Sequence, residues 1–248
     1  MYPIRRPLLL LLTLFQIAFN YLADIWLGVD IVTVTDRYRS DFVPAGYAFA
    51  IWGLIYLAQV IYAVVQMLPA ARGKKIYDII AIPLMISYLG SIAWGISFRL
   101  EYIPLSCLSL FIMLVAAFIV YSKSFNNAET HKGQGWLTLP FSLYAGWLSV
   151  ANVAGFSVWL VYAGNVPGDT GVIVMILLAA VAGLVLLFSF ADHIYPLVIS
   201  WALIAIWVRQ QGVSGKTALI SGCLLLAVNI GYWLMSRRKK TFATRYSN

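Results

Sequence analysis

The chain has 248 residues, of which 62% are hydrophobic and 10% are charged, and its formal net charge is +8. Soluble domains carry about 25% charged residues to cover their cores, so this composition excludes a soluble globular protein and predicts that lipid surrounds much of the chain. The basic residues lie in short loops and at the C-terminal end, not in a stripe with stacking aromatics, so we expect them to reflect membrane topology and not nucleic-acid binding.

Eight apolar stretches are long enough to cross a bilayer, which takes about 20 residues in a helix. In chain order they cover residues 7–27, 45–68, 77–97, 103–121, 137–162, 171–190, 194–208 and 217–236. The first stretch follows Arg5 and Arg6 like a signal peptide, but it lacks a small-x-small cleavage site, so we interpret it as a retained helix. The predicted fold class is an all-α polytopic membrane protein with about eight transmembrane helices.

The distribution of basic residues predicts the orientation of the chain. With eight spans, both termini share one side with the second, fourth and sixth loops, and this side carries most of the 17 Lys and Arg residues. Short basic loops favour the cytoplasm. The run Arg237–Lys240 is expected to anchor the last span there, with binding of anionic lipid as the alternative. We therefore expect cytoplasmic N- and C-termini, in a bacterial inner (plasma) membrane.

The segment GNVPGDT, residues 164–170, is the best internal boundary, because Gly, Pro and Asn mark loops. It predicts a five-helix core over residues 1–163 and a three-helix C-terminal extension over residues 171–240. Residues 241–248 are then expected to form a cytoplasmic tail.

The second apolar stretch carries a stripe of aromatic residues. The segment FVPAGYAFAIWGLIYLAQ, residues 42–59, leads into it and covers its first part, and Pro44 suits the first turn of a helix. Phe49, Trp52 and Tyr56 are spaced three and four residues apart, so they share one face of a helix. Such a stripe either packs against neighbouring helices or lines a binding site.

Three segments carry a resemblance to a known family. The run PAGYAFAIWGLIY, residues 44–56, is similar to the second-helix signature of the TspO/MBR family, the tryptophan-rich sensory proteins. Residues 89–98, LGSIAWGISF, resemble the third-helix pattern of that family, and residues 140–151, PFSLYAGWLSVA, resemble its fifth-helix pattern. Over residues 1–163 the chain therefore resembles a longer, divergent TspO/MBR member with extra C-terminal helices.

The resemblance implies a membrane protein that binds a flat hydrophobic ligand, such as a porphyrin, another tetrapyrrole or a sterol-like molecule, in transport or stress sensing. Indole and phenol faces hold a flat conjugated ring well, and each offset-stacked pair contributes about 0.5–1.5 kcal/mol beyond area burial. A porphyrin-type molecule is thus a candidate ligand, and no cofactor is expected to be required. The candidate ligand-binding residues are Phe49, Trp52, Tyr56, Trp94, Tyr144, Trp147 and Asn152.

The first loop, residues 28–43, is implied by the resemblance to form a lid over the pocket. Its Arg37 and Arg39 would then pair with a propionate-type carboxylate of the ligand. The alternative is a solvated turn with internal Asp–Arg pairs. Within the spans, the amides of Asn20 and Gln59 serve equally well as links between helices or as ligand contacts.

Two other classes of function stay open. In a small, proton-coupled secondary transporter, Asp192 and His193 would carry protons, although a tight turn between two spans explains the same pair. A membrane scaffold or assembly partner is the other alternative. Small residues at Gly90, Ala93 and Gly183 allow close helix approach, within a monomer or in a homo-oligomer.

The sequence gives little support to an enzyme or a metal protein. No common hydrolase or nucleotide-binding motif occurs, and no cluster of ionisable groups lies at one depth in the spans, so we expect no catalytic residues. The two histidines, His131 and His193, are far apart in the sequence, and we expect no metal site. The expected partners are the lipid bilayer and a small hydrophobic ligand.

Overall fold

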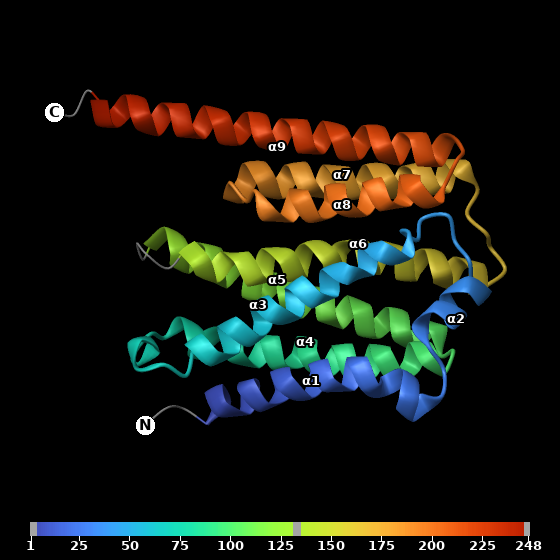
Figure 1. The fold of residues 1–248 in the computed structure, drawn as a ribbon, viewed down its shortest axis with the longest axis horizontal. Coiled ribbons are helices and arrows are strands. Elements are labelled where there is room, and N and C mark those ends of the chain that lie inside the picture. The colour runs from blue at the N-terminus through green and yellow to red at the C-terminus, as the bar shows by residue number, and fades with distance from the viewer. Residues whose placement is uncertain (1–3, 131–134, 246–248) are drawn as a thin grey trace. The chain divides into compact units, whose positions relative to one another are not determined.

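The computed structural model describes residues 4–130 and 135–245. Within these ranges the regular structure is helical (Figure 1), and seven helices are long and apolar enough to cross a membrane. An eighth apolar helix, Ile194–Arg209, is shorter at 16 residues. The predicted all-α polytopic membrane fold with about eight spans is therefore confirmed, while the cytoplasmic location of the termini stays a prediction.

The chain divides into two compact units. Unit 1 comprises Met1–Val43 and Phe49–Pro167, and unit 2 comprises Pro44–Ala48 and Gly168–Asn248. The short segment Pro44–Ala48 thus leaves the first unit for five residues and belongs to the second.

Unit 1 holds the helices of the N-terminal part of the chain. They are α1 (Arg5–Leu27), α2 (Ile31–Arg37), α3 (Ile51–Val65), α4 (Ile76–Arg99), α5 (Ile103–Thr130) and α6 (Thr138–Tyr162). Short 3-10 turns precede α3 (Gly46–Ala50), α4 (Pro69–Ala71) and α6 (Gly135–Leu137). α4 packs against α1 and α5, and α6 packs against α5 and α3. α5 runs nine residues beyond the apolar stretch 103–121, because the polar residues that follow remain helical.

The helix α1 is amphipathic, with polar side chains on its buried face and apolar side chains on its exposed face. Its buried face carries Arg6, Thr13 and Gln16, whereas leucines such as Leu8 and Leu11 are exposed. In a bilayer the exposed apolar side chains meet lipid tails of similar polarity, and the polar groups find partners on neighbouring helices.

Two Arg–Asp pairs join α1 to α4. At one end Arg6 binds Asp78 through two hydrogen bonds, Nε to Oδ1 at 2.9 Å and Nη2 to Oδ2 at 2.8 Å. At the other end the Nε of Arg99 donates to Oδ1 of Asp24 at 2.7 Å. Both arginines are buried. The two helices therefore run parallel, with their register set at both ends.

The arginine of the first pair also closes the loop between α3 and α4. Its Nη1 donates to the carbonyl oxygen of Ala71 at 3.0 Å, and its Nη2 donates to that of Lys74 at 3.1 Å. Its guanidinium lies 5.4 Å from the ring centroid of Tyr77. One buried side chain thus positions a whole turn of backbone.

The first loop, predicted over residues 28–43, contains the short helix α2. Gly28 ends α1 with a φ of 70°, a left-handed conformation that glycine adopts without steric cost. Asp30 then caps α2 by accepting the backbone N–H of Thr33 at 2.8 Å, and its second carboxylate oxygen accepts the Thr33 hydroxyl. These hydrogen bonds lower the pKa of Asp30.

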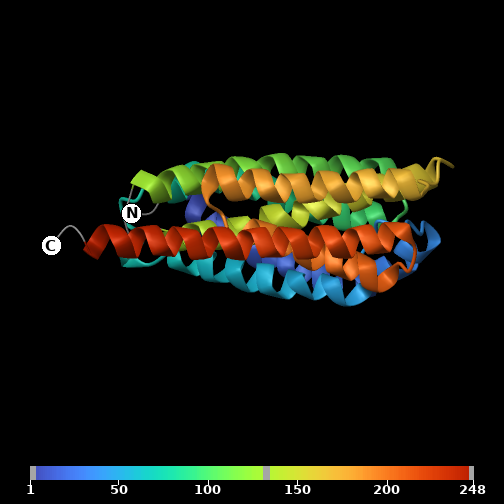
Figure 2. The same ribbon diagram turned by 90° about the horizontal axis from the view of Figure 1, so that it is seen from above.

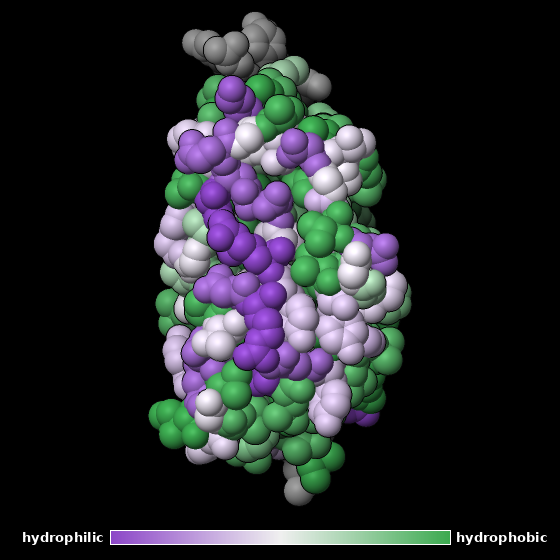
Figure 3. Space-filling model, turned by 90° about the vertical axis from the view of Figure 1, so that its right-hand side faces the viewer, coloured by the Kyte–Doolittle hydropathy of each residue, from purple (hydrophilic) through white to green (hydrophobic). Residues whose placement is uncertain are grey.

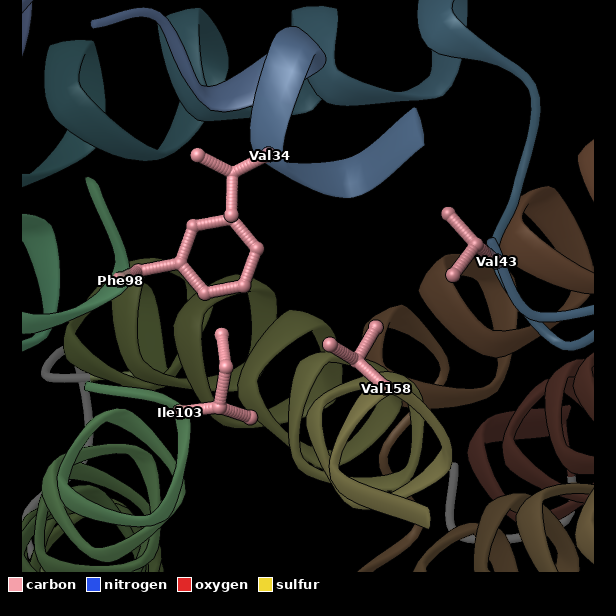
Figure 4. Close-up of a cluster of buried hydrophobic side chains, with 5 residues drawn as sticks. All are labelled: Val34, Val43, Phe98, Ile103 and Val158. Atoms are coloured by element: carbon pink, nitrogen blue, oxygen red, sulfur yellow. The ribbon is translucent and has the colours of Figure 1, made fainter. Parts of the chain in front are cut away.

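A small apolar cluster holds α2 onto the unit. Val34 of α2 and Val43 meet Phe98, Ile103 and Val158, as Figure 4 shows. The five side chains come from the first loop, the α4–α5 region and α6. The loop is therefore packed on a buried surface and is more than a solvated turn.

Unit 2 contains α7 (Asp169–Phe190), α8 (Ile194–Arg209) and α9 (Val213–Arg245), which pack side by side with their axes roughly aligned (Figures 1 and 2). The segment Pro44–Ala48 docks on α8: Ala45 N–H donates to the carbonyl of Ala205 at 3.1 Å, and the indole N–H of Trp201 donates to the carbonyl of Ala48 at 3.2 Å. α9 continues to Arg245, so the predicted tail of residues 241–248 begins within a helix.

The buried arginine of the first ion pair gives a stability prediction. We expect Arg6→Leu to lower the free energy of unfolding by about 3 kcal/mol, because the Asp78 carboxylate and two loop carbonyls lose their partner in a buried setting. The measurement is denaturant unfolding in detergent micelles. The exposed Lys75→Leu serves as control and should change stability by less than about 0.5 kcal/mol. Equal effects of the two substitutions would contradict this role of Arg6.

Candidate ligand-binding site

Five aromatic rings gather between α3 and α6 in unit 1. The ring of Trp52 stacks on Tyr56, with centroids 5.4 Å apart and planes at 26°. It meets the ring of Trp147 edge-on at 6.3 Å and that of Tyr144 at 6.4 Å. Phe49 adds an edge-on contact with Trp147 at 5.7 Å. We call these five residues the aromatic cluster.

Helical spacing explains why these rings meet. Trp52 and Tyr56 lie four residues apart in α3, and Tyr144 and Trp147 lie three apart in α6, so each pair shares a helix face. Phe49 lies in the 3-10 turn Gly46–Ala50 that leads into α3, not in the α-helix itself. All five rings belong to the seven candidate ligand-binding residues of the sequence analysis, which had placed Phe49, Trp52 and Tyr56 on one helix face.

One polar atom inside the aromatic cluster has no protein partner. Trp147 is 2% exposed, and its indole Nε1 finds no hydrogen-bond acceptor among the described residues. A buried indole N–H usually has an acceptor, and leaving it without one costs about 1–3 kcal/mol. Phe49 and Trp52 are only half-buried, so the cluster is closed on the Trp147 side and more accessible on theirs.

The hydroxyl of Tyr144, the phenol next to this indole, already donates a hydrogen bond within the protein. Tyr144 and Ser87 of α4 lie with their hydroxyl oxygens 2.9 Å apart, and the Ser87 hydroxyl also donates to the carbonyl of Met113 at 3.0 Å. Because Ser87 has one proton, Tyr144 is the donor in the first bond. This chain of hydrogen bonds from α6 through α4 to α5 fixes the Tyr144 ring, whereas the buried N–H of Trp147 stays available.

Two of the predicted site residues lie elsewhere. Trp94 stacks on Phe98 at 5.8 Å and packs against the apolar cluster beneath α2. Asn152 donates to the carbonyls of Leu110 at 3.0 Å and Leu148 at 2.8 Å, so its amide ties α6 to α5. The structure does not bring these two side chains into the aromatic cluster.

The two predicted lid arginines differ in their surroundings. Arg37 forms an ion pair with Glu101, whose second carboxylate oxygen accepts the Tyr38 hydroxyl at 2.8 Å. Tyr38 also contacts the Tyr162 ring of α6, edge-on at 5.6 Å. Arg39 is exposed and has no hydrogen-bond partner among the residues that the structure describes.

Glu101 is a residue that the sequence analysis missed. It occupies the turn between α4 and α5 with a φ of 61°, uncommon for a non-glycine residue, and no sequence pattern marks its partners. Its hydrogen bonds with Tyr38 and Arg37 lower its pKa, and the bond that Tyr38 donates raises the pKa of the Tyr38 phenol. Figure 3 shows hydrophilic side chains gathered at the end of the molecule where α2 lies.

The acid–imidazole pair of unit 2 has structural partners. Asp192 is buried and accepts the backbone N–H of Ile194 at 2.8 Å, which caps α8. The Nδ1 of His193 lies 2.7 Å from Oδ1 of Asn229 in α9, whose Nδ2 donates to the His193 carbonyl at 2.9 Å. The pair therefore ties the α7–α8 turn to α9. His131 lies outside the described residues, and within those residues no group of three or more potential metal ligands occurs.

The fold and the site together define a class: a helical membrane protein that spans the bilayer several times and buries an aromatic cluster between two of its helices. The chain matches the model of the TSPO-like protein family over residues 6–235. Because the match covers nearly the whole chain, the protein belongs to this family. No curated protein and no solved structure matches the chain.

The extent of the match also concerns the C-terminal helices. The motifs of the sequence carry the resemblance only over residues 1–163, whereas the family model continues to residue 235, through α7, α8 and most of α9. The three-helix part is therefore a region that the family model describes.

The Glu101 contacts give a prediction for the first loop. We expect Glu101→Gln to speed hydrogen–deuterium exchange of the α2 amides by roughly two- to fivefold, since the exposed ion pair with Arg37 contributes modestly. Asp41→Asn, at an exposed aspartate in the same loop, is the matched control and should leave exchange unchanged.

The same contacts predict a dependence on pH. The pKa of Glu101 in the fold is lower than its ordinary value of 4.5. The stabilisation of α2 by Glu101 is therefore complete above pH 4.5 and is lost as the pH falls through the lowered pKa. Exchange of α2 amides, corrected for intrinsic rates, should therefore rise on acidification in the wild type more than in Glu101→Gln. Identical pH profiles would contradict the assignment.

Proposed function

We propose that this TspO-related membrane protein binds a flat hydrophobic ligand, of the porphyrin, tetrapyrrole or sterol-like kind, against the aromatic cluster of unit 1. The observation that carries the proposal is the buried Trp147 indole N–H, which no acceptor among residues 4–130 and 135–245 satisfies. Small-molecule sites in proteins are mostly apolar and contain a few placed polar groups. A cluster of rings with a buried, unpaired donor has this composition.

The chemistry of binding follows from the two sides of the cluster. Trp52 and Phe49, which are half-buried, offer ring faces for stacking at the accessible side. A flat conjugated ring stacked there would gain about 0.5–1.5 kcal/mol per aromatic pair beyond its area burial. The indole of Trp147 would donate one hydrogen bond to an acceptor atom of the ligand, such as a carbonyl or a ring nitrogen.

Of the two arginines in the proposed lid, Arg39 is the better candidate to bind the ligand. Arg37 is engaged by Glu101, so a ligand carboxylate would have to compete with that ion pair. Arg39 has no such partner among the described residues, and we assign to it the pairing with an anionic substituent of the ligand. Binding of this kind would support a role in transport or in stress sensing.

Two substitutions test the site. Trp147→Phe removes the N–H but keeps an aromatic ring, and Trp52→Leu removes the stacking face. We expect each to weaken binding of a protoporphyrin-type ligand about fivefold to tenfold, because one hydrogen bond or one stacked pair contributes about 1 kcal/mol. The measurement is saturable quenching of tryptophan fluorescence in purified protein.

The matched control is Trp233→Phe in α9, which changes a partly exposed tryptophan outside the aromatic cluster. It should leave the dissociation constant unchanged. If porphyrins and sterols fail to give saturable quenching, or if all three variants bind as the wild type does, the proposed site is wrong.

A further inference from the structure

A polar seam runs through unit 1 between the two ion pairs. On α1 it consists of Arg6, Thr13, Gln16, Asn20 and Asp24, which recur at helical spacing on one face. Arg6 and Asp24 are 18 positions apart, which at 1.5 Å per residue is about 27 Å. This length is close to the hydrocarbon thickness of a bilayer, about 30 Å.

Amide and hydroxyl groups connect the seam between its ends. The Nε2 of Gln16 donates to Oε1 of Gln59 in α3 at 2.9 Å, and both side chains are buried. Asn20 donates to the Gln16 carbonyl at 2.8 Å and to the Ser91 hydroxyl of α4 at 3.2 Å. These bonds hold three helices together, as intramembrane amides commonly do.

Helix packing does not account for three other atoms of the seam. Gln59 Nε2, Gln66 Oε1 and the hydroxyl of Tyr62 are buried and have no protein hydrogen-bond partner among the described residues. In the membrane interior each such group costs several kcal/mol unless it is satisfied. The three are a donor, an acceptor and a hydroxyl that can act as both.

The three atoms belong to one neighbourhood. Gln59, Tyr62 and Gln66 are spaced three and four residues apart along α3 and its C-cap, so they share one helix face. Gln66 donates its Nε2 to the carbonyl of Arg6 at 3.3 Å. Gln59 accepts a hydrogen bond from Gln16, further along α1. The free atoms therefore follow the seam inward from the Arg6 end.

We propose that the polar seam is a water-binding site, in which a file of ordered water molecules joins the three free atoms on the face of α3 that meets α1. A buried water typically makes about three hydrogen bonds to groups that would otherwise be unsatisfied, and the mixture of donors and acceptors supplies these. The site is separate from the aromatic cluster, because its ligand is water and its lining is polar.

Radiolytic hydroxyl-radical labelling of the purified protein tests this proposal, because radicals formed from bound water modify the side chains next to it. Tyr62 should be labelled at least tenfold faster than Tyr144. Tyr144 is the matched control, since it is equally buried but donates its hydroxyl to Ser87. Equal protection of the two tyrosines would overturn the proposal.

A second measurement does not depend on labelling. Removing a dry, unsatisfied hydroxyl should raise the midpoint of thermal unfolding, whereas removing one that binds water leaves that water short of a partner. We therefore expect Tyr62→Phe to lower the midpoint by about 2–4 °C. A higher midpoint for Tyr62→Phe would contradict a hydrated seam.

Discussion

Unit 1 depends on the double ion pair between α1 and α4. In lipid, apolar side chains gain little by leaving the solvent, so packing and polar contacts decide how helices are placed. Arg6 with Asp78 and Arg99 with Asp24 set the register at both ends of the two helices. Only in this register does Asn20 of α1 meet Ser91 of α4. The pairs also place charges where the helix dipoles favour them on α4, with Asp78 in its first turn and Arg99 in its last.

The candidate site follows from this placement. Gly95 of α4 lies close against α1, since a Cβ there would lie 3.2 Å from the Phe19 ring and 3.5 Å from the Asn20 side-chain oxygen. Trp94, one residue earlier and about 100° around the helix, therefore points away from α1 and packs beneath α2. The aromatic cluster between α3 and α6 therefore contains the five other predicted aromatic residues and not Trp94. α2, the apolar cluster beneath it and Glu101 then form one end of the unit.

Much of the fold and part of the site could be predicted from the sequence. Apolar length indicates the spans, and helical spacing places Phe49, Trp52 and Tyr56 on one face, where the structure has them. Trp94 and Asn152 were assigned to the same pocket, but the rotation of α4 and α6 about their axes depends on contacts between helices that a single sequence does not show. α2 was missed because seven residues are too few for a clear period. Arg6, Arg99 and Glu101 bind Asp78, Asp24 and Arg37, which are 72, 75 and 64 positions away in the sequence. No local pattern can predict pairs at such separations.

A charge-exchange cycle on Asp24 and Arg99 tests the central claim, that the ion pairs hold α1 against α4, most directly. The free energy of unfolding would be measured for Asp24→Arg, for Arg99→Asp and for the double variant in the same detergent. Each single change leaves two like charges together and should be strongly destabilising, and the double variant should recover at least about 1 kcal/mol relative to the sum of the two. Strictly additive effects would mean that the two side chains do not interact, and would contradict the account.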